Sequence, residues 1–241
     1  EKPNIFINHL LNNILPKLLT SSDNEKTNFL SALEGKRISS GPSGAPTRGK
    51  LEVLPTGKNF FSVDIRAIPT ETAWDLGKRS AEQIMELYLQ ENGEHLSHLA
   101  ISIWGTSTMR NGGEDICQLF ALMGLRPIWD GTLRRVVDVE VIPLSVLNRP
   151  RVDVTLRISG LFRDAFPQII ELIRRGQNLI GNLKESASNN PLAESYRNGN
   201  TKSRIYGSAP GSYGAGLQEI INSGSWENQS ELADAFIEWS K

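Results

Sequence analysis

The chain opens with apolar residues at the spacing of one helix face. Between residues 5 and 19 these residues are Ile7, Leu10, Leu11, Ile14, Leu15 and Leu18. Residues three and four apart lie on the same side of an α-helix, and only Pro16 interrupts this pattern. The pattern therefore predicts a helix, or a kinked pair of helices, at the start of the chain.

The rest of the chain alternates between strand and helix patterns. Continuous or alternating apolar runs predict strands at 99–104, 127–129, 136–142, 152–158 and 204–206. Helical spacing predicts helices at 70–93, 114–123, 163–179, 217–221 and from 229 onward. Such alternation is typical of α/β proteins. We expect an α/β fold with a mainly parallel or mixed sheet, flanked by helices in a Rossmann-like arrangement.

Segments rich in glycine, proline or polar residues separate these elements. Residues 35–64 form a long Gly/Pro-rich loop, and residues 105–113 form a second loop after a strand. Residues 184–203 have few apolar anchors, which predicts a mobile linker. We therefore expect an α/β domain over 1–183, the linker, and a strand-turn-helix segment over 204–241 that packs on the same domain.

Composition narrows the classes of function. The chain has 241 residues, of which 39% are hydrophobic and 22% charged, as in ordinary globular proteins. Its 26 basic and 27 acidic residues give a net charge of −1. The chain as a whole therefore has no positive electrostatic field that would attract nucleic acid. The longest apolar run is far shorter than the roughly 20 residues that span a bilayer. The single cysteine, Cys117, forbids an internal disulfide. We expect a cytoplasmic protein.

The ends of the chain suggest a piece of a longer protein. There is no Met at position 1, and Lys241 lies inside an amphipathic pattern without a helix stop signal.

Several common catalytic motifs are missing from the sequence. No Gly-Lys pair continues into Ser or Thr, so there is no P-loop for ATP hydrolysis. There is no Gly-x-Ser-x-Gly elbow, and the three histidines do not have the spacing of a zinc site. The glycine-rich run 207–216 lacks the Gly-x-Gly-x-x-Gly order, which favours a tight turn with close backbone approach over dinucleotide binding.

Two places are suited to bind a ligand. Residues 104–113 leave the carboxyl end of a predicted strand and lead into a helix, where anions bind in open α/β sheets, and Arg110 adds positive charge. In the strand at 152–158, one face carries the polar residues Arg151, Asp153, Thr155 and Arg157. This polar face is either a solvated or ion-paired surface, or a cavity wall that Arg163 and Asp164 extend.

Five strings of residues, in the same order along the chain, resemble the large subunit of aerobic cobaltochelatase, which is homologous to the large subunit of magnesium chelatase. The strings lie at 41–49, 54–64, 104–106, 149–155 and 160–166. The resemblance covers nearly the whole chain, which corresponds to the C-terminal part of a much longer family protein. The run at 207–216 and Phe60 to Asp64 resemble the cobalt branch more than the magnesium branch.

The resemblance implies an ATP-dependent metal chelatase, a ligase that forms nitrogen–metal bonds. The large subunit would bind the tetrapyrrole, here a corrin-ring precursor (hydrogenobyrinic acid a,c-diamide), and insert Co²⁺ as the substrate metal in cobalamin biosynthesis. An AAA-type ATPase subunit and its partner subunit would hydrolyse ATP. The fragment would also need the rest of its own large subunit, so we expect it to be inactive alone. The alternatives are insertion of Mg²⁺ into protoporphyrin IX, a non-catalytic tetrapyrrole-binding or partner-docking module, and nucleotide binding at the 207–216 turn.

Metal insertion removes protons from the ring and water from the metal, so carboxylates or histidines near the ring are the expected bases and transient ligands. The candidates are Glu114, Asp64 and Asp164. Carboxylates on the ring call for cationic or hydrogen-bonding partners. The candidates for substrate binding are Arg48, Lys58, Arg66, Arg110, Arg163 and Tyr213. No residue is assigned as a metal ligand.

Overall fold

The computed structural model describes residues 5–42, 44, 46–48, 51–60, 64–131, 133–209 and 211–239. Its internal contacts divide the chain into two compact units. One comprises residues up to 64 together with 109–111, and the other comprises 65–108 with 112–241. The α/β sheet therefore begins its own unit near residue 65, whereas we expected one domain over 1–183.

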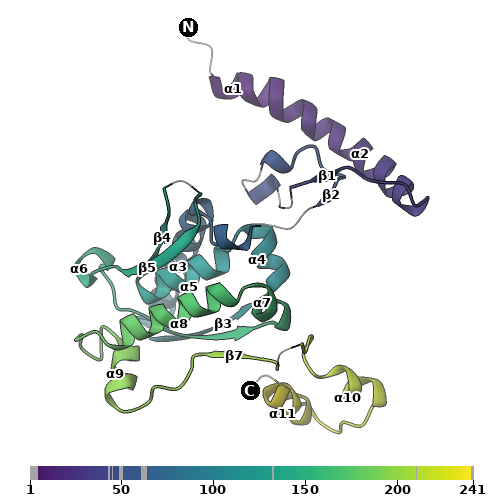
Figure 1. The fold of residues 1–241 in the computed structure, drawn as a ribbon. Helices are drawn as coiled ribbons and strands as arrows, with labels where there is room; N and C mark the ends of the chain where they lie inside the picture. The colour runs from purple at the N-terminus through teal and green to yellow at the C-terminus, as the bar shows by residue number, and fades with distance from the viewer. Residues whose placement is uncertain are drawn as a thin grey trace. The chain divides into compact units, whose positions relative to one another are not determined.

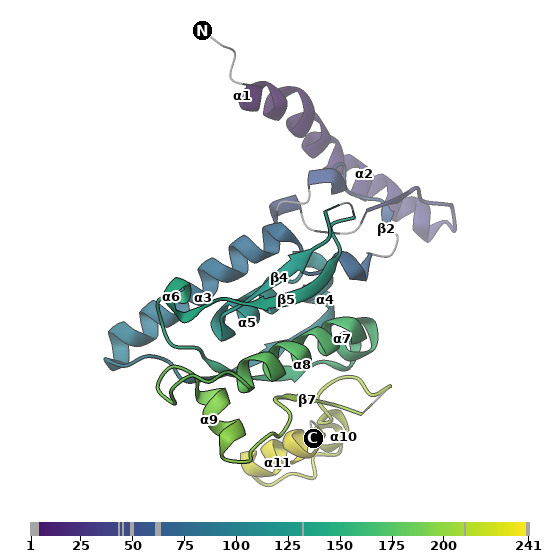
Figure 2. The ribbon, with the colours of Figure 1, turned by 60° about the vertical axis from the view of Figure 1, so that its left-hand side comes forward.

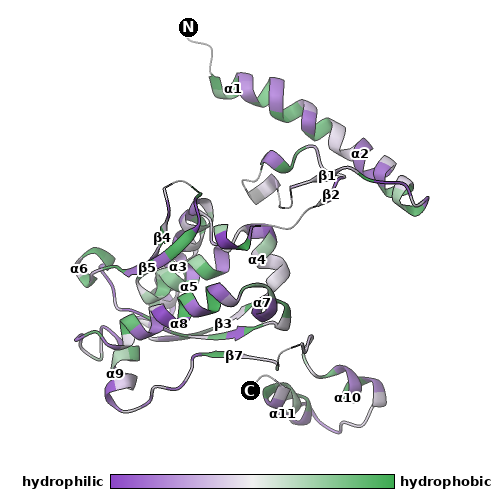
Figure 3. Ribbon diagram, viewed as in Figure 1, coloured by the Kyte–Doolittle hydropathy of each residue, from purple (hydrophilic) through white to green (hydrophobic). Residues whose placement is uncertain are grey.

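The first unit is built on one long helix. Its parts are α1 (Ile5–His9), the π-helical turn η1 (Leu10–Ile14) and α2 (Leu15–Leu33). Pro16 lies in the first turn of α2, directly after the π-helical turn, which is a position where a missing N–H is tolerated. In Figure 3 the hydrophobic residues alternate with polar ones along the helix.

The Gly/Pro-rich segment of the first unit contains little regular structure but is bound to α2. It contains β1 (Ser40–Gly41), η2 (Pro46–Arg48), η3 (Leu51–Val53) and β2 (Asn59–Phe60), and β1 and β2 pair in parallel. Asn28 of α2 donates a hydrogen bond to the carbonyl of Gly57 at 2.7 Å. A Cβ on Gly57 would lie 2.6 Å from the backbone of Asn24, so this close contact requires glycine.

A three-stranded parallel sheet forms the centre of the second unit (Figure 1). Its strands are β3 (His98–Ile103), β6 (Asp153–Ile158) and β7 (Ile205–Gly207), in the order β3-β6-β7. The predicted α/β fold, a parallel sheet with flanking helices, is confirmed. An antiparallel pair, β4 (Leu125–Trp129) and β5 (Val136–Val141), lies in the same unit.

Three long helices build the core of this unit. They are α3 (Glu71–Asn92), α5 (Glu114–Met123) and α8 (Pro167–Gly181). Helix α3 begins where predicted because Thr70 accepts a hydrogen bond from the N–H of Ala73. Helix α5 contacts α3, α8, β3, β4 and β6, and most of its residues are fully buried. A Cβ on Gly77 of α3 would lie 2.6 Å from Cβ of Cys117 in α5, so the two helices meet closely.

The remaining helices are short. They are η4 (Ile65–Ala67), α4 (Gly105–Asn111), α6 (Leu144–Leu147), α7 (Gly160–Ala165), α9 (Pro191–Arg197), α10 (Gln218–Ser223) and α11 (Gln229–Trp239). Figure 2 shows α10 and α11 near β7, at the C-terminal end of the chain.

Two predicted elements differ from the structure. Residues 105–113 were expected to form a loop, but α4 occupies most of them and ends at Gly112, which has φ of 74°. The single helix expected at 163–179 is two helices, α7 and α8, because Pro167 starts a new helix after Ala165.

The segment 184–203, expected to be a mobile linker, contains α9 and is held by polar contacts to a buried arginine. Arg151 is only 1% exposed and donates to both carboxylate oxygens of Glu185, at 2.8 and 3.0 Å. It also donates to the carbonyls of Met123, Gly124 and Ile142. Asn190 donates to Glu185, and its side-chain oxygen caps α9. These contacts explain why a segment with few apolar residues is ordered.

Replacing Arg151 by leucine should lower the free energy of unfolding by about 3–5 kcal/mol, because it leaves the buried carbonyls and Glu185 without their donor. Urea denaturation followed by circular dichroism measures this loss. The control is Arg175→Leu, which removes an ion pair to Asp138 from a side chain that is 60% exposed and should cost at most about 1 kcal/mol. Equal stability of both variants would contradict a stabilising role for Arg151.

The stability of the second unit should also depend on pH through Glu185. Burial raises the pKa of this carboxyl, but the bonds from Arg151 and Asn190 outweigh burial and hold the pKa below its usual value of 4.5. The stabilisation is therefore complete above that usual value and is lost as the pH falls through the lower folded-state pKa. Urea titrations at several pH values should show that the free energy of unfolding falls less at acid pH in Glu185→Gln than in the unchanged protein. Identical acid-side slopes would rule out this contribution.

Candidate functional site

The carboxyl ends of the three parallel strands lie at one edge of the sheet, and each leads directly into a helix or a turn. Strand β3 leads through Trp104 into α4, and β6 leads through Ser159 into α7. Strand β7 leads into the glycine-rich turn at 207–216, of which Gly207 is still part of the strand. Ligands of open α/β sheets bind at this edge, because backbone N–H groups and side chains from several strands converge there. We call this region the carboxyl edge.

Ser159 ties β3, α4 and α7 together at the carboxyl edge. Its hydroxyl oxygen accepts hydrogen bonds from the N–H groups of Gly105, at 3.1 Å, and Phe162, at 3.2 Å. Its own N–H donates to the carbonyl of Ile103 at 3.0 Å. A Cβ on Gly105 would lie 2.9 Å from Leu161, so α4 and α7 start in close contact. These bonds fix the direction in which both helices leave the sheet.

The glycine-rich turn after β7 lies against the start of α7. A side chain on Gly160 would overlap the carbonyl oxygen of Ser212, so glycine is required there. The hydroxyl of Ser208 donates to the same carbonyl at 2.9 Å. The sequence predicted that the run 207–216 allows close backbone approach to a ligand or a neighbouring domain. In the structure the backbone of this run lies against α7 of the same unit.

Three of the residues predicted for the site are in direct contact across this junction. Asp164 accepts a hydrogen bond from Nε of Arg163 at 3.0 Å and another from the hydroxyl of Tyr213 at 2.8 Å. Arg163 and Asp164 belong to α7, and Tyr213 belongs to the glycine-rich turn. The helix and the turn are thus joined through one carboxylate.

These contacts decide the chemical character of the cluster. The bonds from Arg163 and Tyr213, with the backbone of Gly211, hold the pKa of Asp164 below its usual value. The bond to Asp164 in turn raises the pKa of Tyr213. A carboxylate with a lowered pKa is ionised at neutral pH and is a weaker proton acceptor than an ordinary aspartate. Asp164 is therefore better suited to hold Arg163 and Tyr213 in place than to accept a proton.

Arg163 retains hydrogen-bonding capacity beyond this pair. Its terminal nitrogens, Nη1 and Nη2, are buried and have no hydrogen-bond partner among the described residues. Burial of a cationic group without an acceptor is costly, and a carboxylate matches the geometry of two guanidinium nitrogens. The cluster can therefore accept an anionic group, provided that the side chain becomes accessible.

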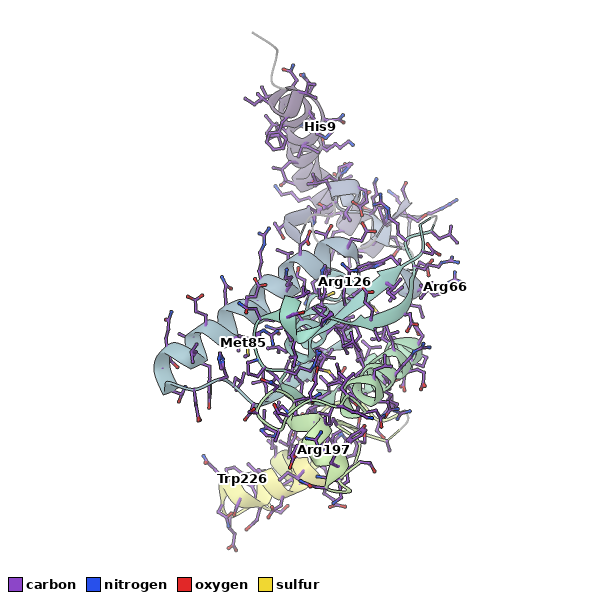
Figure 4. All side chains as sticks on the ribbon, turned by 90° about the vertical axis from the view of Figure 1, so that its left-hand side faces the viewer. His9, Arg66, Met85, Arg126, Arg197 and Trp226 are labelled. Carbon is purple, nitrogen blue, oxygen red and sulfur yellow. The ribbon has the colours of Figure 1, made fainter. Side chains whose placement is uncertain are left out.

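The other predicted site residues belong to other elements. Arg110 is exposed in the last turn of α4, and Glu114 is the half-buried first residue of α5. Arg66, labelled in Figure 4, is exposed in η4. Lys58 and Asp64 are exposed in the first unit. The side chain of Arg48 lies outside the described residues.

The structure also contains a cleft that the sequence analysis missed. It has a volume of about 560 Å³ and lies between α3, α6 and the adjoining ends of α5, β4 and β5. Met85 and Arg126, both labelled in Figure 4, line it, as do Trp74 and Arg149. None of the predicted site residues lines this cleft. Arg149 lies in one of the family-like strings, but no pattern in the sequence indicated a cavity there.

The charged groups of this cleft are already engaged. Arg149 donates to the carbonyls of Ala121, Leu122 and Pro150, and burial lowers its pKa. Arg126 pairs with Glu140 on the neighbouring strand. The cleft therefore offers apolar walls and paired charges, which suit an apolar group better than an anion.

The described residues contain no group of three or more His, Cys, Asp or Glu side chains arranged to hold a metal ion. Among the same residues, no helix is both long and apolar enough to cross a membrane.

Comparison with known proteins defines the family. The family model described as CobN/Magnesium Chelatase matches residues 1–241. The aerobic cobaltochelatase subunit CobN of Pseudomonas aeruginosa is 46% identical over 95% of this chain and 20% of its own length. The chloroplastic magnesium-chelatase protein ChlH of Oryza sativa subsp. japonica is 33% identical over 91% of this chain and 16% of its own length.

A solved structure supports the same relationship. The catalytic subunit of cobaltochelatase from Mycobacterium tuberculosis matches with a TM-score of 0.84 and 40% identity, over 96% of this chain and 20% of that chain. This chain therefore belongs to the CobN/magnesium chelatase family. It spans about a fifth of the length of the relatives it matches.

The contact between Tyr213 and Asp164 predicts how the glycine-rich turn is held. Tyr213→Phe removes the hydroxyl donor but keeps the ring, so amide hydrogens in residues 207–216 should exchange roughly 2- to 5-fold faster. Hydrogen exchange followed by mass spectrometry measures this change. Tyr206→Phe, on the neighbouring strand, is the matched control and should leave the exchange unchanged. If the turn in Tyr213→Phe exchanges as in the unchanged protein, other contacts hold it.

Proposed function

We propose that this chain is part of the tetrapyrrole-binding large subunit of an ATP-dependent metal chelatase, which inserts Co²⁺ into hydrogenobyrinic acid a,c-diamide during cobalamin biosynthesis. The observation that carries this proposal is the family match over the whole chain, with higher identity to cobaltochelatase CobN (46%) than to magnesium-chelatase ChlH (33%). The glycine-rich turn at 207–216, which resembles the cobalt branch, supports the same choice.

In this proposal Arg163 binds a carboxylate of the ring substrate. Its two terminal nitrogens have no partner among the residues that the structure describes, and Asp164 holds the guanidinium through Nε. A guanidinium fixed through Nε matches a carboxylate through two parallel bonds from its terminal nitrogens once these buried atoms become accessible. Tyr213 positions the turn beside it. We assign Arg48, Lys58, Arg66 and Arg110 to further anionic groups of the substrate.

Insertion of a divalent ion displaces the pyrrolic protons, and these need acceptors. We propose Glu114 and Asp64 as these acceptors. The bonds that Asp164 accepts from Arg163 and Tyr213 lower its pKa and disfavour proton transfer to it, so we propose that it orients these two residues. Co²⁺ is the substrate metal in this scheme.

ATP hydrolysis is proposed to belong to partner subunits. The chain has no Gly-Lys-Ser or Gly-Lys-Thr sequence for phosphate binding. We propose an AAA-type ATPase subunit and a second partner subunit as the source of the energy for insertion, with the reaction completed only in the full-length large subunit.

Two other functions have specific support. The similarity to magnesium-chelatase ChlH over 91% of this chain favours insertion of Mg²⁺ into protoporphyrin IX as the main alternative. The cleft of about 560 Å³, which contains none of the predicted site residues, favours a module that docks a partner without taking part in insertion.

Absorbance titrations of the full-length protein with a metal-free corrinoid and with metal-free protoporphyrin test these functions. We expect tighter binding of the corrinoid. Arg163→Ala should weaken it about 10-fold, and Arg163→Lys should rescue it only in part, because lysine keeps the charge but not the two-nitrogen geometry.

The matched control is Arg175→Ala, on the exposed side of α8, which should bind as the unchanged protein does. Preference for protoporphyrin would favour the magnesium alternative. Absence of binding to either ring would favour the docking module.

A further inference from the structure

Trp104 is unusual among the residues that follow β3. It is 49% exposed, although the preceding Ile103 is 1% exposed and the following Gly105 is buried. A tryptophan side chain gains considerable free energy from burial, so a half-exposed one leaves much of that stabilisation unused. It lies at the carboxyl edge, where the cluster of Arg163, Asp164 and Tyr213 also lies.

The backbone of Trp104 is fixed. Its carbonyl accepts hydrogen bonds from both the N–H and the hydroxyl of Thr108, each at 3.0 Å. The next residue, Gly105, is bonded to Ser159. The indole therefore projects from a rigid part of the fold, between the end of β3 and the start of α4.

A guanidinium also holds the indole ring. Arg157, on the neighbouring strand β6, places its guanidinium carbon 5.6 Å from the centre of the Trp104 ring. The same carbon lies 4.8 Å from the centre of the Phe236 ring in α11. Such distances are typical of cation–π attraction.

Arg157 has little else to bind. Its Nε is buried and has no hydrogen-bond partner in the described part of the chain. The polar face of β6 was expected to be either an ion-paired surface or a cavity wall. Asp153 of that face does pair with Arg204, but Arg157 contacts two aromatic rings instead. The guanidinium of Arg157 therefore holds the rings of Trp104 and Phe236 through cation–π contacts.

We propose that Trp104 is a binding residue for the substrate, with its indole packed against the conjugated face of the tetrapyrrole, and that Arg157 is a positioning residue that holds the indole. This inference rests on the proposed function. A flat, rigid aromatic side chain matches a flat macrocycle through offset stacking, and rigidity lowers the entropic cost of binding. Arg163 then fixes a carboxylate at the rim, while Trp104 contacts the ring itself.

The test uses the full-length protein and a metal-free corrinoid as the probe, titrated by absorbance. Trp104→Ala should weaken binding about 10-fold, and Trp104→Phe, which keeps an aromatic face, should stay within about 3-fold of the unchanged protein. Trp226 is also exposed, at 40%, and is labelled in Figure 4. Trp226→Ala is the matched control and should bind normally.

Arg157 is tested in the same titration. Arg157→Gln should weaken binding several-fold, and Arg157→Lys should restore most of the affinity, because lysine keeps the cation beside the ring. A role for Arg157 in stability alone would lower the thermal midpoint of both variants without this difference in affinity between them.

A second measurement needs no variant. Bound corrinoid should protect Trp104 of the unchanged protein from oxidation by N-bromosuccinimide, quantified by peptide mass spectrometry, while Trp226 remains reactive. Equal oxidation of Trp104 with and without corrinoid, or normal binding by a folded Trp104→Ala variant, overturns the inference. In that case binding that still depends on Arg163 leaves the proposed function standing. If the unchanged protein binds neither corrinoid nor porphyrin, the inference on Trp104 and the proposed function both fail.

Discussion

The second unit depends on one buried guanidinium. Arg151 donates to the carbonyls at the end of α5, to the carbonyl that follows β5 and to the carboxylate of Glu185. Arg149, two residues earlier, donates to the carbonyls of Ala121 and Leu122 in the last turn of α5. A helix ends with carbonyls that have no partner within the helix, and they carry a partial negative charge. Two arginines that precede β6 satisfy them, so α5, the β4–β5 pair and the sheet are held in one arrangement.

This arrangement has a consequence for the carboxyl edge. Helix α5 contacts α3, α8 and strands β3 and β6, and its residues are almost completely buried. The sheet is therefore rigid on the side that α5 covers. Trp104, Ser159 and the glycine-rich turn all extend from strands of this rigid sheet. Side chains that must meet a substrate within a fraction of an ångström are best placed on such a frame.

Hydrophobic periodicity predicted the elements that bury a continuous apolar face. Helix α5 and strand β6 lie where their patterns placed them, because apolar burial determines both pattern and structure. Helix α4 was missed because its residues are polar and flanked by glycines, and its start is fixed by Ser159, which is distant in the sequence. Helix α9 was missed for a related reason. Glu185 and Asn190 order this segment through polar contacts that composition does not reveal.

The candidate site was predictable only in part. Arg163, Asp164 and Tyr213 were each identified from the sequence, but their contact joins residues 49 positions apart and depends on how the turn folds over α7. Nothing in the sequence distinguished Arg157 from the other charged residues of its strand, since its aromatic neighbours are Trp104, which follows β3, and Phe236 of α11. The cleft near Arg149 depends on the packing of five elements, which local patterns do not contain.

The missing side chain at Gly160 couples two segments that are far apart in the sequence. Because the backbone of the turn rests directly on α7, any change in the path of that turn displaces the helix that carries Arg163. The residues of this turn are also those that resemble the cobalt branch rather than the magnesium branch. A change in the sequence of this turn can therefore shift the guanidinium of Arg163 without any change in α7 itself.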